Sequence, residues 1–156
     1  MAASRDAMTT IACNRREMAC DSRSSFDNGE YLTTDDKIER IGDSLVGCAG
    51  NWPAIFKFIA WFKDQTKERP DFTDDDEFTA VVLNRRGIYV YDGSTYPSRA
   101  CHNFFAIGSG SMAARAAMLC GKSPADAVAI AIKCDKNSGS PIRTFKLSMS
   151  KKRKKR

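Results

Sequence analysis

The sequence predicts a single α+β domain. Its 156 residues are 42% hydrophobic and 28% charged, which suits one domain large enough to bury a sizeable core. Strand-like runs open the chain, a helical stretch interrupts them near the middle, and two further helical stretches precede the C-terminal region. Strands and helices grouped in separate blocks are typical of an α+β architecture.

Positive charge is concentrated at the C-terminus. The formal net charge is +6, and residues 151–156 are all Lys or Arg, while the other 19 basic residues match 19 acidic ones. We expect residues 150–156 to be a disordered basic tail. No apolar run is long enough to cross a bilayer and no secretory signal is visible, so the expectation is a cytoplasmic protein without membrane contact.

Cysteine and histidine usage argues against a metal or cofactor site. The six cysteines lack CxxC spacing and lie in apolar runs, so we interpret them as reduced thiols in or near the core. His102 is the single histidine, and no carboxylate–histidine cluster accompanies it. We therefore expect neither a metal ion nor a cofactor.

Residues 9–21, Thr-Thr-Ile-Ala-Cys-Asn-Arg-Arg-Glu-Met-Ala-Cys-Asp, predict two short strands joined by a tight turn. Polar neighbours flank Ile11, and a compact apolar run ends at Asp21. The eight residues before this stretch are polar and show no periodicity, so we expect them to be a leader outside the core.

A threonine pair that follows Met8 and leads into such a hairpin resembles the start of a mature threonine peptidase. The resemblance is to the N-terminal nucleophile hydrolases, specifically proteasome β-subunits and the HslV-type peptidase. It runs from Thr9 to about Ser140 and implies a four-layer αββα sandwich over residues 9–149. The leader, residues 1–8, would be removed by self-cleavage. Alternatively, translation would start at Met8, and removal of this methionine would also leave Thr9 as the first residue.

The resemblance implies that the Thr9 hydroxyl is the nucleophile and its freed α-amine the base. An α-amine has a pKa of about 7.7 to 8.0, so it is partly unprotonated at neutral pH. Lys37 matches the family's lysine beside the threonine, and Asp21 matches the aspartate that pairs with it. Burial would lower the pKa of Lys37 and Asp21 would raise it; the sequence leaves open which effect is larger.

The phrase Val-Gly-Cys-Ala-Gly at 46–50 resembles the small-residue turn between a strand and the first helix of the family. The resemblance implies that the amide of Gly47 binds the oxyanion. Leu45 and Ala49 match positions that line the substrate pocket.

Two polar phrases near the C-terminus complete the expected site. In Gly-Ser-Gly at 108–110, the resemblance makes Ser109 a group that orders the threonine amine and Gly110 a backbone neighbour. A strand, such a turn and a helix could also form a phosphate-binding loop, but neither GxxxxGK[ST] nor GxGxxG is present. In Asp-x-x-Ser-Gly at 135–139, Asp135 and Ser138 would support the nucleophile.

The helix expected at 52–67, with Pro53 in its first turn, has aromatic residues at helical spacing. Residues 69–77, with Arg-Pro and an acidic run, leave room for a turn or two, so the second helix of this layer should be truncated. A β-hairpin at 78–92 and helices at 112–119 and 124–134 follow.

These observations predict a threonine-type endopeptidase that cleaves polypeptides as a ring-forming homo-oligomer, with a separate ATPase unfoldase as a further partner that the resemblance allows. The alternative is a catalytically inactive relative whose basic tail docks nucleic acid or an acidic partner. The presence of Thr9, Asp21 and Lys37 favours the enzyme. Ring stoichiometry, cleavage preference and the role of the tail are not encoded in a recognisable way.

Overall fold

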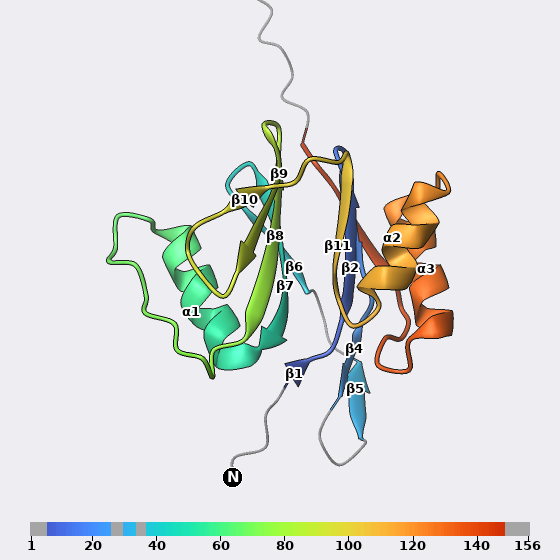
Figure 1. The fold of residues 1–156 in the computed structure, drawn as a ribbon, viewed down its shortest axis with the longest axis horizontal. Coiled ribbons are helices and arrows are strands. Elements are labelled where there is room, and N and C mark those ends of the chain that lie inside the picture. The colour runs from blue at the N-terminus through green and yellow to red at the C-terminus, as the bar shows by residue number, and fades with distance from the viewer. Residues whose placement is uncertain (1–5, 26–29, 34–36, 149–156) are drawn as a thin grey trace, which may run out of the picture.

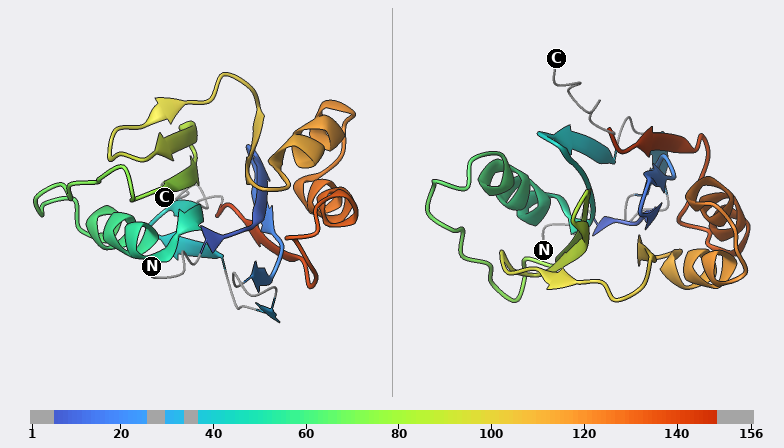
Figure 2. Two further views of the ribbon diagram at one scale, coloured as in Figure 1. Left: turned by 60° about the horizontal axis from the view of Figure 1, so that its bottom comes forward. Right: turned by 90° about the horizontal axis from the view of Figure 1, so that it is seen from above.

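Two antiparallel sheets lie face to face between two helical layers (Figures 1 and 2). The structure is a computed structural model that describes residues 6–25, 30–33 and 37–148. One sheet is covered by α1 (Trp52–Lys63), and the other by α2 (Ser111–Leu119) and α3 (Pro124–Cys134). The expected αββα order is therefore confirmed.

The first sheet has the order β1-β7-β8-β9-β10, and β6 also pairs with β7. Its strands are β1 (Asp6–Ala7), β6 (Ile38–Ile41), β7 (Ser44–Asn51), β8 (Phe78–Asn84), β9 (Gly87–Asp92) and β10 (Ser98–Arg99). The second sheet, in the order β11-β2-β3-β12, comprises β11 (Phe104–Gly108), β2 (Thr10–Asn14), β3 (Glu17–Cys20) and β12 (Arg143–Lys146). A separate hairpin is formed by β4 (Arg23–Ser25) and β5 (Tyr31–Thr33).

Three apolar clusters hold these layers together. Alternate residues of the two sheets, such as Ile11, Leu45 and Val81, fill the space between them, because successive side chains of a strand point to opposite faces. Under α1 the core is aromatic and centres on Phe58. Under α2 and α3 it consists largely of alanines, whose small side chains let the helices lie close to the sheet.

The helix α1 ends at Lys63 rather than at the expected Lys67. At its start, the side chain of Asn51 accepts a hydrogen bond from the amide of Ala54 at 3.2 Å, which satisfies one free donor of the first turn. At its end, the Asp64 carboxylate accepts bonds from the amide and hydroxyl of Thr66. Such local side-chain bonds compete with continued helix.

The connection from α1 to β8, residues 64–77, contains no helix, so the expected truncation of the second helix is confirmed. Side chains of the connection cover part of the apolar surface instead. The ring of Phe72 lies 4.7 Å from that of Phe78, and the guanidinium of Arg69 lies over the rings of Trp61 and Tyr96 at 4.9 and 4.5 Å.

Two expectations are wrong. Residues 46–50 are not a turn, because β7 continues to Asn51 through its pairing with β8. The cysteines are not all in the core: Cys101, Cys120 and Cys134 are exposed, whereas Cys13, Cys20 and Cys48 are buried. Burial raises the pKa of Cys13 to about 12, so this thiol stays protonated at neutral pH.

No helix in the described ranges is long and apolar enough to span a membrane.

The end of β7 should tolerate no side chain at Gly50. Its φ is +119°, and a Cβ there would lie 2.4 Å from the carbonyl oxygen of Glu77. We expect Gly50→Ala to lower the free energy of unfolding by about 2–4 kcal/mol. The control is Gly42→Ala, with φ +57° and open space around the added carbon, which should cost about 1 kcal/mol. Equal losses in urea unfolding would contradict this packing.

Candidate active site

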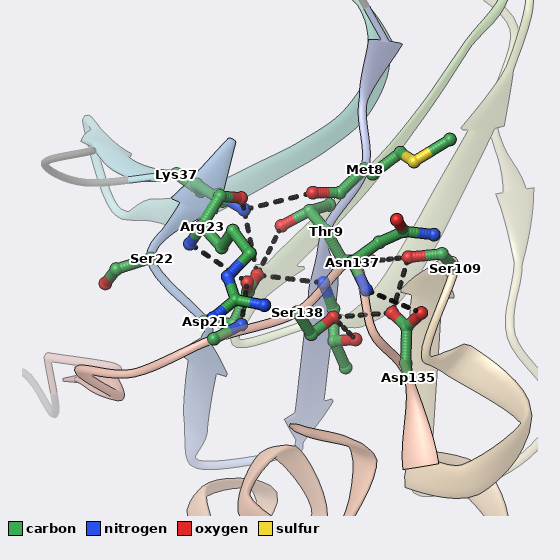
Figure 3. A network of polar contacts seen from close by, with 12 residues as sticks. Met8, Thr9, Asp21, Ser22, Arg23, Lys37, Ser109, Asp135, Asn137 and Ser138 are labelled. Carbon is green, nitrogen blue, oxygen red and sulfur yellow. Dashed lines mark hydrogen bonds and ion pairs between the residues drawn. The ribbon is translucent and has the colours of Figure 1, made fainter. Parts of the chain in front are cut away.

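The buried carboxylate of Asp21 is the centre of the site (Figure 3). Its Oδ1 accepts hydrogen bonds from the Thr9 hydroxyl at 2.8 Å, the Thr10 amide at 3.0 Å and the Lys37 ammonium at 2.9 Å. Its Oδ2 accepts from the amides of Arg23 and Gly139, each at 3.0 Å. A buried charge is stable only when it is paired and hydrogen-bonded, and these five donors meet that requirement.

The hairpin of β2 and β3 places Thr9 beside Asp21. Ile11 lies opposite Cys20 in the antiparallel register, and the amide of Asp21 donates to the carbonyl of Thr10 at 3.1 Å. Thr9 precedes β2 and Asp21 follows β3, so the two meet at the open end of the hairpin. The register of this strand pair therefore sets the distance between them.

Lys37 reaches this position from the other sheet, just before β6. Its ammonium contacts the Asp21 carboxylate, the carbonyl of Met8 at 3.3 Å and the carbonyl of Arg23. Burial lowers the pKa of Lys37 from 10.5, and the attraction of Asp21 raises it by less, so the net direction is downward. Burial is the larger of the two effects that the sequence left undecided.

A second polar network supports Thr10. The hydroxyls of Thr10 and Ser138 lie 2.7 Å apart, and Ser138 donates to Oδ2 of Asp135 at 2.7 Å. Ser109 donates to the same oxygen at 2.6 Å and lies 3.4 Å from the carbonyl oxygen of Thr9. Since a hydroxyl has one proton, the shorter bond to Asp135 is the one that Ser109 makes.

Partial burial raises the pKa of Asp135, but hydrogen bonds from Ser109, Ser138 and the amide of Asn137 together lower it below its ordinary value. These donors favour the charged form of the carboxylate. Asp135 therefore remains an acceptor that fixes both serine hydroxyls.

The Gly-Ser-Gly turn lies against the threonine pair. Gly108 has φ +93°, and a Cβ on it would be 1.9 Å from the carbonyl oxygen of Thr9. A Cβ on Gly110 would be 2.0 Å from the hydroxyl of Thr10. Only glycine permits such an approach, and Gly110 neighbours Thr10 rather than the expected Thr9.

The structure joins six expected residues in these two networks: Thr9, Asp21, Lys37, Ser109, Asp135 and Ser138. Gly47 lies within β7 between β6 and β8, opposite Ile38 and Val81. Its amide therefore faces a neighbouring strand, so this position does not fit the expected role of oxyanion donor. Leu45 is fully buried in the core between the sheets.

A cavity of about 690 Å³ opens beside the Met8–Thr9 junction. Met8, Ala49, Gly108 and Ser109 line it on the side of the threonine. Four acidic residues line the rest together with neighbours on the same segments: Asp74, Asp76, Glu77 and Asp92. Ala49 thus lines this cavity, whereas Leu45 belongs to the core.

Sequence reasoning missed several groups of the site. Thr10 was visible only as the second threonine of a pair. The amide of Gly139 and the carbonyls of Met8 and Arg23 are main-chain atoms, which any residue supplies, so no sequence signal could have found them.

In the described ranges, no group of three or more His, Cys, Asp or Glu residues could hold a metal ion.

Comparisons with known proteins identify the fold. No protein-family model and no curated protein matches the sequence. Solved structures do match: BPH, a bacterial proteasome homologue from Thiobacillus denitrificans, has a TM-score of 0.67 at 21% identity over 91% of this chain and 99% of its own. HslV from Trypanosoma brucei has a TM-score of 0.69 at 20% identity, over 90% and 99%.

The chain therefore has the fold of the proteasome-type N-terminal nucleophile hydrolases. The fold class inferred from the threonine hairpin is confirmed. A complex of the same Thiobacillus protein with Epoxomicin matches with a TM-score of 0.63 at 21% identity, over 90% of this chain and 99% of that one.

Lys37→Met should change how stability depends on pH. Because folding lowers the pKa of Lys37 from 10.5, the unfolded chain binds more protons between the folded pKa and 10.5. The free energy of unfolding of the wild type should therefore rise with pH across that interval, relative to the variant. Urea unfolding of both proteins from about pH 8 upward measures the difference. If the free energies of unfolding of the two proteins changed with pH in parallel, folding would not change the pKa of Lys37.

Proposed function

We propose that this chain is a threonine-type endopeptidase whose nucleophile is Thr9. The supporting observation is one shared oxygen: Oδ1 of Asp21 accepts from both the Thr9 hydroxyl and the Lys37 ammonium. The same ammonium lies 3.3 Å from the carbonyl oxygen of Met8. A nucleophile, a cation and the carbonyl of a peptide bond thus meet at one place, in a fold shared with proteasome-type peptidase subunits.

The first reaction is removal of the leader. The Thr9 hydroxyl oxygen attacks the carbonyl carbon of Met8, the Met8–Thr9 amide bond breaks, and the Thr9 nitrogen takes a proton to become the free α-amine. Lys37 polarises the carbonyl by its contact with the oxygen. Water then hydrolyses the resulting ester, which releases residues 1–8 with a carboxylate at Met8.

The mature enzyme repeats this chemistry on polypeptides. The Thr9 hydroxyl attacks a substrate carbonyl, and the α-amine accepts the hydroxyl proton and passes it to the leaving amine. An ester on Thr9 is the intermediate, which water hydrolyses. A main-chain amide at the site is the proposed donor to the oxyanion, and such a donor lowers the barrier by about 3–4 kcal/mol in other enzymes.

The leader already shows how an extended peptide can lie at the site. Its strand β1 pairs with the end of β7, with Asp6 opposite Asn51 and Ala7 opposite Gly50. Once the leader has gone, this strand edge can pair with a substrate main chain. Alternatively, translation starts at Met8 and an aminopeptidase removes this methionine, which leaves the same free strand edge and the same first residue, Thr9.

Assembly into a homo-oligomeric ring is part of the proposal. The helix α2 exposes 80% of Met112 and 72% of Leu119. Apolar side chains of this size at both ends of one helix suit contact with a second subunit. The ring would enclose Thr9 and restrict access to unfolded polypeptides, which a separate ATPase unfoldase would supply.

Activity of the mature form tests the proposal directly. A protein that begins at Thr9, released from a cleavable fusion, is compared with the same protein preceded by one alanine. The α-amine is a base, whereas an amide nitrogen is not, so only the first protein should hydrolyse a fluorogenic peptide. Equal hydrolysis by the extended protein, with an intact mass showing that the alanine is still attached, would overturn the mechanism.

Lys37→Ala should reduce peptide hydrolysis at least about 100-fold, since a positioned charge or proton donor contributes that order of magnitude. Lys122→Ala, in the exposed connection between α2 and α3, removes an equal charge outside the two networks and should leave turnover unchanged. Turnover near the wild-type value in Lys37→Ala would remove this lysine from the reaction.

Light scattering at micromolar concentration should show a multi-subunit species. Met112→Lys and Leu119→Lys, placed on the exposed ends of α2, should shift it toward the monomer, because a charge in an apolar contact is costly. Lys122→Glu, an exposed change beyond α2, is the control. A monomer at all concentrations would contradict the ring.

A further inference from the structure

Two β-hairpins of the chain carry the same turn sequence. Asn14-Arg15-Arg16 joins β2 to β3, and Asn84-Arg85-Arg86 joins β8 to β9. In each turn the asparagine Oδ1 accepts a hydrogen bond from the amide of the second arginine, at 2.8 Å for Arg16 and 2.9 Å for Arg86. This side-chain bond fixes the turn and leaves two exposed arginines at each tip.

The two tips lie side by side, although one belongs to each sheet. The guanidinium of Arg15 donates to the carbonyl of Arg85 at 3.5 Å, and that of Arg99 donates to the carbonyl of Arg86 at 2.9 Å. The turn between β8 and β9 and the last residues of β12 lie at the top of Figure 1.

The end of β12 extends this cluster. Arg40 donates to the carbonyl of Lys146 at 2.7 Å and to the hydroxyl of Ser148 at 3.1 Å. Arg85 donates to the carbonyl of Ser148 at 3.3 Å. We call the resulting exposed surface the basic pole; its members are Arg15, Arg16, Arg40, Arg85, Arg86, Arg99 and Lys146.

Five arginines of the pole form no ion pair with the other described residues. These are Arg15, Arg16, Arg40, Arg86 and Arg99. The side chains of Arg15, Arg40 and Arg99 donate to neutral carbonyls and a hydroxyl, which hold a guanidinium without cancelling its charge. Beside the pole, a hollow of about 590 Å³ is lined by Arg16 and Lys146, with Glu17 as its one carboxylate.

The six basic residues of the C-terminal run follow the pole directly. Ser148 is in contact with Arg40 and Arg85, and residue 151 is only three residues further along the chain. Three residues span at most about 10 Å. In the sequence, the six basic residues therefore follow closely on a residue that contacts the pole.

We propose that the basic pole binds the sugar-phosphate backbone of double-stranded nucleic acid. Arginine forks match phosphate oxygens, and backbone binding needs charge rather than apolar contact. A protein or membrane partner would need exposed apolar groups, and a single strand would need aromatic platforms. The large exposed hydrophobic residues of the described part lie outside the pole: Met8, Leu32, Phe56, Tyr96, Met112 and Leu119.

The position of the pole makes this binding independent of peptide hydrolysis. Thr9 lies before the first residue of β2, whereas Asn14 ends that strand. Five strand residues separate the two by about 16 Å. A duplex bound at the pole would therefore localise the enzyme without covering the cavity beside Thr9, and the proposal does not depend on the proposed peptidase activity.

The test is fluorescence anisotropy of the full chain with labelled 20-base-pair DNA and RNA duplexes, titrated at several salt concentrations. The key variant is R16Q/R86Q, whose side chains make no hydrogen bond within the described ranges, so the fold should be kept. The matched control is K122Q/K133Q, which removes two exposed charges outside the pole, one in α3 and one in the connection before it. Equal midpoints of urea unfolding for the wild type and both variants would show that the substitutions leave the fold intact.

We expect both duplexes to bind the wild type, with an affinity that falls steeply with salt. In R16Q/R86Q the slope of log affinity against log salt should decrease by about 1 for each lost phosphate contact, while K122Q/K133Q matches the wild type. Removal of residues 151–156 should weaken binding but leave it measurable. A stronger response to one duplex would identify which nucleic acid is bound.

Three results would overturn the proposal. The first is absence of binding by the wild type at about 50 mM salt. The second is an equal effect of R16Q/R86Q and K122Q/K133Q, which would remove the folded pole from the interaction. The third is equal competition by polyglutamate, which would identify an acidic protein as the partner.

Discussion

The buried charge of Asp21 is the constraint on which the rest of the site depends. It has no exposed surface, so its ionised form persists only because hydroxyl, ammonium and amide groups surround it. Removing one partner of a buried pair such as Asp21 and Lys37 costs about 3–5 kcal/mol, because the remaining charge stays unpaired. The same contacts that hold the fold together at this point therefore hold Thr9 in place.

This carboxylate also joins elements that are distant in sequence. Thr9 and Asp21 flank strands of the second sheet, Lys37 precedes a strand of the first sheet, and Gly139 lies between α3 and β12. The reacting groups thus come together only when both sheets and the third helix are assembled. Nearby, the glycines of the Gly-Ser-Gly turn bring α2 against the threonine pair, which closes the site from the other side.

The sequence predicted the features that have a local signature. Helix α3 has such a signature in its Ser123 cap and first-turn proline, and Thr9, Asp21 and Lys37 are indicated by their order and by the resemblance to a family. Groups that act through main-chain atoms, such as Gly139, had no signature. Gly47 lies among small residues that are typical of a turn, so the sequence did not indicate that it pairs within a strand. The two Asn-Arg-Arg turns meet because the two sheets pack face to face, and a sequence alone does not show such packing.

The central claim is that Thr9 acts with its own amine, and an epoxyketone tests this most directly because its ring closure needs both a hydroxyl and a free amine on one residue. The protein is treated with the inhibitor, digested and mapped by mass spectrometry. The account predicts one adduct per chain, on a peptide that begins at Thr9. An adduct on another residue, or on a chain that still carries residues 1–8, would contradict it.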